Sequence, residues 1–173
     1  MPNFEIEYSG IEGLYIINSL SDITYDQSKF EIFGLNMKFV QENESLSKKG
    51  VLRGLHYQTK NSQGKLVRVV EGKIFDVAVD MRKKSKTYLK WFGIELSEDN
   101  KKQFYIPEGF AHGFYVMSEY AKVIYKVSNY WYPEYEVGIP WNDDTLNIKW
   151  PIKNKEEIII ADKDKNYIPL KRK

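Results

Sequence analysis

The sequence predicts an all-β domain, either a sandwich or a barrel. Apolar and polar residues alternate with a period of two along most of the chain, which is typical of strands that lay one face on a core. Helical periodicity is scarce, and many short strands follow one another without intervening helices. The 173 residues contain no repeat, low-complexity linker or break in composition, so we expect one domain over residues 1–173.

The strands are bounded by polar or glycine-containing stretches. They are predicted at residues 4–8, 14–18, 37–41, 51–57, 66–70, 73–80, 88–96, 103–106, 114–117 and 121–128. A tight turn at Glu71-Gly72 is expected to join two of them, and a hairpin is expected around residues 118–120. In the strand 73–80 the odd-numbered residues should share one face, and the even-numbered residues, including Asp76, should share the other. Short helical segments are expected near the termini, at residues 25–33 and after Pro151.

Composition excludes several classes of protein. The net charge is +2, from 26 basic and 24 acidic residues, which is too even for a nucleic-acid-binding surface. The chain has no cysteine, so disulfides and thiolate chemistry are excluded. Neither a signal peptide nor a run of about 20 apolar residues is apparent, so we expect a cytoplasmic protein without a membrane segment.

Only two histidines occur, His56 and His112, and both lie next to glycine-containing stretches. Histidine is the side chain whose ordinary pKa lies nearest neutrality, so it suits proton transfer. Two hydrogen-bonded core histidines are the alternative that the residues leave open. No metal site is predicted, because two distant histidines without a third ligand at a characteristic spacing give no ligand pattern.

Several charged or polar residues interrupt segments that otherwise resemble buried strands. On an open sheet they would face solvent, but in a closed barrel some must point into the lumen, where charge is costly unless it is paired or binds a ligand. A lumen with basic, histidine and tyrosine side chains suits an anionic, hydroxyl-rich ligand such as a sugar phosphate. These residues are Arg53, Lys65, Arg68, Asp76, Lys122, Lys126 and Asn129.

The sequence resembles the dTDP-4-dehydrorhamnose 3,5-epimerase family of cupins. The similarity runs in order from about residue 39 to the C-terminal tail. The matching stretches are VLRGLHYQ (51–58), QGKLVR (63–68), GKIFDVAVD (72–80), IPEGFAHGF (106–114), Tyr125-Lys126, Asn129-Tyr130, Trp141-Asn142-Asp143 and Trp150-Pro151.

The resemblance implies a jelly-roll (cupin) barrel, a homodimer and a nucleotide-sugar substrate, with no metal or other cofactor. Enzymes of this family remove the proton next to the 4-keto group of the sugar and return it on the opposite face of the ring. A carbon-bound proton next to a ketone is acidic only when the enolate is stabilised, so the site needs a base, an electrophile and an opposing acid. Members act at carbon 3, at carbon 5 or at both, and the sequence leaves this choice open.

Carried over by motif, His56 is the expected base and Tyr125 the acid that returns the proton from the other face. Lys65 is expected beside the 4-keto oxygen. Asp164, in the stretch 162–165, is expected to orient His56, as carboxylates commonly orient catalytic imidazoles. Asp162 is an open alternative for this role.

The resemblance also implies a set of residues that contact the sugar and the phosphates. They are Arg53, His112, Asp76 and Tyr130, together with Gln41 and Asn43 from the segment that precedes the first matching stretch.

One segment departs from the family pattern. The family carries an N-terminal Asp-x-Arg-Gly-x-Phe stretch whose Arg and Phe help to hold the nucleotide, and the corresponding residues 20–30 contain no Arg and no matching Gly. The substrate is therefore expected to be either dTDP-4-keto-6-deoxyglucose or a GDP-linked 4-keto sugar, such as a heptose destined for a capsule or another surface polysaccharide. Two further hypotheses are a non-catalytic cupin that binds sugar nucleotides and a metal-dependent cupin enzyme.

Overall fold

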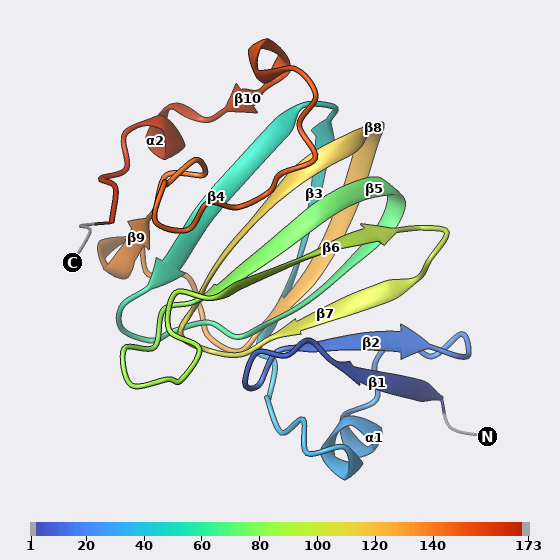
Figure 1. Cartoon of the computed structure of the whole chain (residues 1–173). Helices are drawn as coiled ribbons and strands as arrows, with labels where there is room; N and C mark the ends of the chain where they lie inside the picture. The colour runs from blue at the N-terminus through green and yellow to red at the C-terminus, as the bar shows by residue number, and fades with distance from the viewer. Residues whose placement is uncertain (1–2, 171–173) are drawn as a thin grey trace.

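The structure, a computed structural model, describes residues 3–170 and is predominantly antiparallel β-sheet (Figure 1). Its strands are β1 (Phe4–Tyr8), β2 (Tyr15–Ser19), β3 (Gln41–Lys48), β4 (Val51–Gln58), β5 (Lys65–Asp80), β6 (Trp91–Ser97), β7 (Lys102–Ile106), β8 (Phe110–Val127), β9 (Glu136–Gly138) and β10 (Ile159–Ile160). The helices are short: α1 (Gln27–Ile32), α2 (Asp162–Lys165) and single 3₁₀ turns at Pro133–Tyr135 and Lys155–Glu157.

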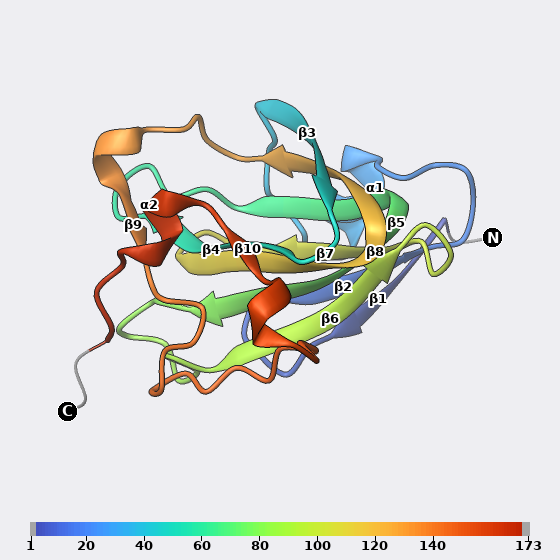
Figure 2. The same ribbon diagram turned by 90° about the horizontal axis from the view of Figure 1, so that it is seen from above.

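Two long strands hold the barrel together. β5 and β8 pair along their whole length, and each changes its second neighbour halfway. The first half of β5 pairs with β7 and its second half with β6, while β8 pairs first with β4 and then with β3. The strands therefore form two layers that share β5 and β8, as Figures 1 and 2 show. This architecture confirms the predicted all-β, cupin-type barrel.

The two predicted hairpins inside these strands were wrong. At residues 71–72 and 118–120 the chain does not reverse; instead β5 and β8 bend together, with register shifts on either side of Glu71-Gly72. Gly72 has φ +76°, and a Cβ on it would lie 2.0 Å from the carbonyl oxygen of Tyr120. A glycine at such a bulge gives the same local signal as a glycine in a turn, so the sequence did not separate the two.

Three other boundaries differ from the prediction. The strand predicted at residues 37–41 does not form before Gln41, where β3 begins; Met37 and Phe39 instead pack against an apolar cluster outside the barrel. β6 begins at Trp91 rather than at residue 88, because residues 81–90 form a loop around the buried carboxylate of Asp80 at the end of β5. The strand predicted at 114–117 begins earlier, so that His112 lies within β8.

The alternation predicted for residues 73–80 is confirmed. Ile74 and Ala78 belong to the apolar cluster inside the barrel, whereas Val77 and Val79 belong to a second cluster on the other face. The C-terminal segment, including Leu146, covers that second face. A third cluster packs α1 and the chain after it against β1, β2, β5 and β7.

The C-terminal segment also runs along β4 at one end of the barrel, where β10 pairs with β4 in parallel (Figure 1). α2 follows directly and lies next to β4. In residues 3–170, none of the helices reaches the length and hydropathy of a membrane span.

Candidate active site

A cavity of about 730 Å³ opens between β3, β4, β5, β8 and the C-terminal segment. Its volume lies in the range of small-molecule binding sites, and its wall combines apolar and polar side chains. The residues that line it and that carry the argument below are Gln41, Asn43, Arg53, His56, Lys65, His112, Tyr125, Trp131, Glu136, Lys163 and Asp164.

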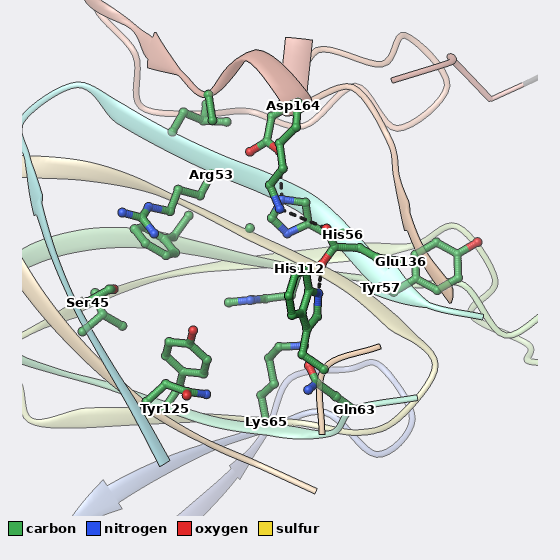
Figure 3. A pocket seen from close by; sticks show the side chains of 18 of the residues that line it. Ser45, Arg53, His56, Tyr57, Gln63, Lys65, His112, Tyr125, Glu136 and Asp164 are labelled. Carbon is green, nitrogen blue, oxygen red and sulfur yellow. Dashed lines mark hydrogen bonds and ion pairs between the residues drawn. The ribbon is translucent and has the colours of Figure 1, made fainter. Parts of the chain in front are cut away.

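The centre of the site is a pair formed by His56 and Asp164. His56 Nε2 lies 3.1 Å from Asp164 Oδ1, and the two side chains come from β4 and α2 (Figure 3). Asp164 is almost fully buried, whereas 23% of the His56 side chain is exposed. The other ring nitrogen of His56, Nδ1, makes no hydrogen bond within residues 3–170. A half-buried imidazole with one nitrogen held by a carboxylate and the other unoccupied has the arrangement of a general base.

The Asp164 carboxylate is held by more than His56. Its Oδ2 accepts a hydrogen bond from the backbone N–H of Gly54 at 3.1 Å, and its Oδ1 also accepts one from the hydroxyl of Tyr167 at 2.9 Å. Burial alone would raise the pKa of Asp164, but the hydrogen bonds from His56, Gly54 and Tyr167 outweigh it and lower the pKa. The carboxylate therefore stays ionised beside the imidazole.

Asp162, the alternative partner of His56, lies elsewhere. It is exposed and accepts a hydrogen bond from Lys165 Nζ at 2.8 Å, and it does not line the cavity. Of the two aspartates that the sequence left open, the structure brings only Asp164 to His56.

Gly54 allows the backbone of β4 to reach the Asp164 carboxylate. Its φ is +98°, and a Cβ would lie 2.5 Å from the carbonyl oxygen of His112 on the neighbouring strand. The pairing of β4 with β8 shifts register between Arg53 and His56. Only glycine fits this close approach, and the irregularity leaves the N–H of residue 54 free to bond Asp164.

Lys65 and Tyr125 lie across the cavity from Asp164 (Figure 3). Burial lowers the pKa of Lys65 to about 8, although the carboxylates of Asp76 and Glu136 oppose this shift. The ammonium therefore remains mostly protonated at neutral pH and can stabilise an oxyanion.

Tyr125 has the properties of a proton donor. Burial raises the pKa of its phenol, against the opposing influence of the positive charges of Arg53 and Lys163. Its hydroxyl makes no hydrogen bond within the part of the chain that the structure describes. A protonated phenol in a half-buried cavity can give a proton to a ligand.

A second His–Asp pair lies in the same pocket. His112 Nε2 is 2.7 Å from Asp76 Oδ1, with His112 on the wall and Asp76 behind it, 0% exposed. Burial raises the pKa of Asp76, although the attraction of His112 and Lys65 opposes this. Asp76 does not line the cavity, so it reaches a ligand only through His112 and through its charge.

Two further basic side chains, Arg53 and Lys163, line the cavity. Arg53 Nη2 donates to Ser47 Oγ at 3.0 Å, and Lys163 Nζ lies 3.0 Å from Glu136 Oε1. The other oxygen of Glu136 accepts a hydrogen bond from the indole of Trp131 at 2.9 Å. These bonds outweigh the burial that alone would raise the pKa of Glu136, so that its pKa is lowered.

The remaining predicted contact residues divide into two groups. Gln41 and Asn43 lie on the cavity side of β3, and their side chains hydrogen-bond one another at 2.6 Å. Tyr130 does not line the cavity and is 56% exposed, whereas its neighbour Trp131 is part of the wall.

Sequence reasoning missed Trp131, Glu136, Lys163 and Tyr167. Lys163 and Tyr167 lie one and three positions from Asp164 in the sequence. The segment that brings Asp164 to the cavity therefore brings these two residues close to it as well. Trp131 lies in an aromatic-rich loop and Glu136 at the start of β9, and neither carried a motif of its own. Among residues 3–170, no group of three or more His, Cys, Asp or Glu side chains is arranged to hold a metal ion.

An antiparallel β-barrel of the cupin type with an acid–base pocket at its centre defines the class of this protein. Comparison with known proteins gives the family: residues 20–172 match the model of the dTDP-4-dehydrorhamnose 3,5-epimerases, and the chain belongs to that family. It is therefore an isomerase.

Individual relatives agree with this assignment. The dTDP-4-dehydrorhamnose 3,5-epimerase of Methanothermobacter thermautotrophicus is 51% identical over 148 residues, which cover 86% of this chain and 80% of that protein. The crystal structure of the enzyme of that name from Elizabethkingia anophelis has a TM-score of 0.91 and 43% identity, and the match covers 96% of both chains. The dTDP-6-deoxy-D-glucose-3,5-epimerase of Legionella pneumophila, solved in complex with dTDP-4-keto-L-rhamnose, has a TM-score of 0.89 and 43% identity, covering 95% of this chain and 91% of that one.

Proposed function

We propose that the protein epimerises dTDP-4-keto-6-deoxyglucose at carbons 3 and 5, and that the product serves the synthesis of a surface polysaccharide. The observation that carries the proposal is the His56–Asp164 pair, which faces Lys65 and Tyr125 across one cavity (Figure 3). The names of the relatives support the thymidine carrier, because proteins about half identical to this chain are called dTDP-4-dehydrorhamnose 3,5-epimerases.

The reaction would proceed in two proton transfers at each carbon. His56 takes the proton from the carbon next to the 4-keto group, and the electron pair of the broken C–H bond moves into an enolate whose negative charge lies on the former keto oxygen. The Lys65 ammonium stabilises that oxygen. Tyr125 then gives its proton to the opposite face of the carbon, and the C=O bond re-forms. Water returns a proton to Tyr125 and removes one from His56.

The basic residues Arg53 and Lys163 support a diphosphate in the ligand. Arg53 and Lys163 line the cavity, and the positive charge of each opposes the rise that burial causes in the pKa of Tyr125. A diphosphate between them would accept hydrogen bonds from both, and Lys163 would exchange Glu136 for a phosphate oxygen. His112, Gln41 and Asn43 are available for the sugar hydroxyls.

A second candidate substrate is a GDP-linked 4-keto sugar such as a heptose. The observation that favours it is the N-terminal segment, which lacks the family's Arg and packs on its own sheet. Phe30 is buried in the cluster outside the barrel, Gln103 Nε2 donates to the carbonyl of Thr24 at 2.6 Å, and no described residue before Gln41 lines the cavity. The carrier must then be held in another way than in the family pattern.

The deciding experiment is proton NMR in deuterated water with the purified protein and 4-keto sugars on thymidine and on guanosine carriers. We expect deuterium at carbons 3 and 5 of the thymidine-linked sugar, with His56→Asn as the inactive control. Deuterium exchange only into the guanosine-linked sugar would show that the GDP-linked sugar, and not the thymidine-linked one, is the substrate. Binding without exchange on either carrier would identify a non-catalytic sugar-nucleotide-binding protein.

We also propose that the protein acts as a homodimer in the cytoplasm, as the family resemblance implies. A second copy could supply the contacts to the nucleotide that this chain's own residues 20–30 do not make. Light scattering at micromolar concentration should give twice the mass of one chain, and the mass of a single chain would contradict the proposal.

A further inference from the structure

Tyr167 touches both members of the His56–Asp164 pair. Its hydroxyl donates to Asp164 Oδ1 at 2.9 Å, the same oxygen that lies 3.1 Å from His56 Nε2. Its ring meets the imidazole of His56 edge to face, with centroids 6.0 Å apart and planes at 81°. Tyr167 is not part of the cavity wall, so it acts on a ligand only through these two residues.

A glycine provides the space for this ring. Gly138 on β9 is the cross-strand neighbour of His56, and a Cβ on Gly138 would lie 2.2 Å from the Tyr167 ring. The Tyr167 ring therefore occupies the space that a side chain at position 138 would fill if that residue were not glycine. β4, β9 and the C-terminal segment meet at this contact, and a single methyl group added to Gly138 would disrupt it.

We propose that Tyr167 is a positioning residue that fixes the Asp164 carboxylate, and through it the His56 imidazole, in the orientation that proton abstraction requires. The inference rests on the proposed role of His56 as the base. Asp164 lies on a helix of four residues near the end of the chain, which alone constrains its side chain weakly. The Gly54 N–H holds Oδ2 and the Tyr167 hydroxyl holds Oδ1, so the carboxylate plane is fixed at both ends.

The segment after α2 is hydrogen-bonded to the rest of the fold, and this restricts the position of Tyr167. The backbone N–H of Leu170 donates to Asp143 Oδ2 at 2.7 Å, and the other oxygen of that buried carboxylate accepts from the N–H groups of Thr145 and Leu146. Tyr167 thus lies between two anchored points, Asp164 and Leu170. Because its own position is restricted, Tyr167 can hold the Asp164 carboxylate, and through it the His56 imidazole, in one orientation.

The first test compares Tyr167→Phe with Tyr120→Phe, a matched change at a tyrosine that is 51% exposed and outside the cavity. Loss of a hydrogen bond to a charged acceptor should lower kcat of Tyr167→Phe about tenfold. KM should remain unchanged, because Tyr167 touches no ligand. Tyr120→Phe should retain wild-type kcat. A rise in KM at constant kcat, or no change in either constant, would overturn the proposal.

A double-mutant cycle separates positioning from a general loss of stability. If Tyr167 acts through Asp164, then Tyr167→Phe should slow an Asp164→Ala protein by less than about twofold. Equal losses in the wild-type and the Asp164→Ala backgrounds would show that the tyrosine acts by another route.

Gly138→Ala offers a rescue experiment. The added methyl group should displace the Tyr167 ring and lower kcat about as much as Tyr167→Ala does. Removing the ring removes the clash, so Gly138→Ala with Tyr167→Ala should be no slower than Tyr167→Ala alone. A further loss in the double variant would contradict this account of the contact.

A measurement without substrate keeps the inference testable if the proposed reaction is not observed. The chain has only two histidines, and each has its Nε2 within hydrogen-bond distance of an aspartate, so the imidazole N–H signals can be followed by nitrogen–proton NMR with His56→Asn and His112→Asn for assignment. In Tyr167→Phe the His56 signal should broaden through faster exchange with water, while the His112 signal stays sharp. An unchanged His56 signal would overturn the positioning role independently of any activity.

Discussion

His56 Nε2 lies 3.1 Å from Asp164 Oδ1, although 108 residues separate the two positions in the chain. The pair forms because β10 runs beside β4 and delivers α2 to the strand that carries His56. The contact depends on the C-terminal segment staying in place, so the proposed base is complete only in the fully folded chain.

The first prediction concerns the choice between the two tail aspartates. Asp164→Asn should lower kcat about 100-fold or more, because a neutral amide no longer stabilises the protonated imidazole that forms during abstraction. The matched control is Asp162→Asn, two residues away and exposed, which should change kcat less than about twofold. Deuterium exchange into the substrate measures both. Equal losses in the two variants would remove Asp164 from its proposed role.

The second prediction separates abstraction from return of the proton. In Tyr125→Phe, His56 can still take the proton and give back a deuteron to the same face, so exchange should continue while inversion slows. We expect the ratio of exchange to epimerisation to rise at least about tenfold, as seen when both are followed by NMR in deuterated water. Tyr8→Phe, at an exposed tyrosine, is the control. If both rates fell together, Tyr125 would not be the acid.

The third prediction is a pH dependence. Since burial lowers the pKa of Lys65 to about 8, the ammonium proposed to stabilise the enolate is lost as the pH rises through that value, and kcat should fall above it. The Asp76 carboxylate stabilises the ammonium, so Asp76→Asn should move this fall to lower pH. Glu71→Gln, which removes a surface carboxylate that pairs with Lys122, should leave it in place. An unshifted profile in Asp76→Asn would contradict the coupling.

The fourth prediction concerns stability. Asp80 is fully buried and accepts hydrogen bonds from Arg82, Ser85 and Thr87, which outweigh the burial and hold its pKa well below the ordinary value. Asp80→Asn should lower the free energy of unfolding by about 3 kcal/mol at pH 7.

The pH dependence of this loss has a definite sign. Because the folded-state pKa of Asp80 is depressed, its contribution is complete above the unfolded-state value and is lost as the pH falls. In urea unfolding, the difference between wild type and Asp80→Asn should be constant from pH 7 to 5 and shrink below about pH 4. Asp99→Asn, at an exposed carboxylate, should differ little from wild type throughout. A difference that grew toward acid pH would contradict the assignment.

Local sequence patterns predicted most strands but not how they continue. The period of two placed β1, β4 and the faces of β5 correctly, because side-chain alternation is a property of each strand alone. Whether the chain turns or only bends at Gly72 depends on which strand lies beside it, and that partner is β8, about 50 residues further along. Glycine permits both outcomes, so the hairpin prediction failed there.

For the site, the sequence alone determined the chemical groups. It singled out His56, Lys65, Tyr125 and two aspartates in the tail, because their motifs resemble those of a known family. Tertiary structure decided which groups meet. It brought Asp164 rather than Asp162 to His56, placed Asp76 behind His112, and added Glu136, Lys163 and Tyr167. The physical reason is that motifs record local residue order, whereas a contact such as that between His56 and Asp164, 108 positions apart, exists only after the barrel has closed and the tail has packed against it.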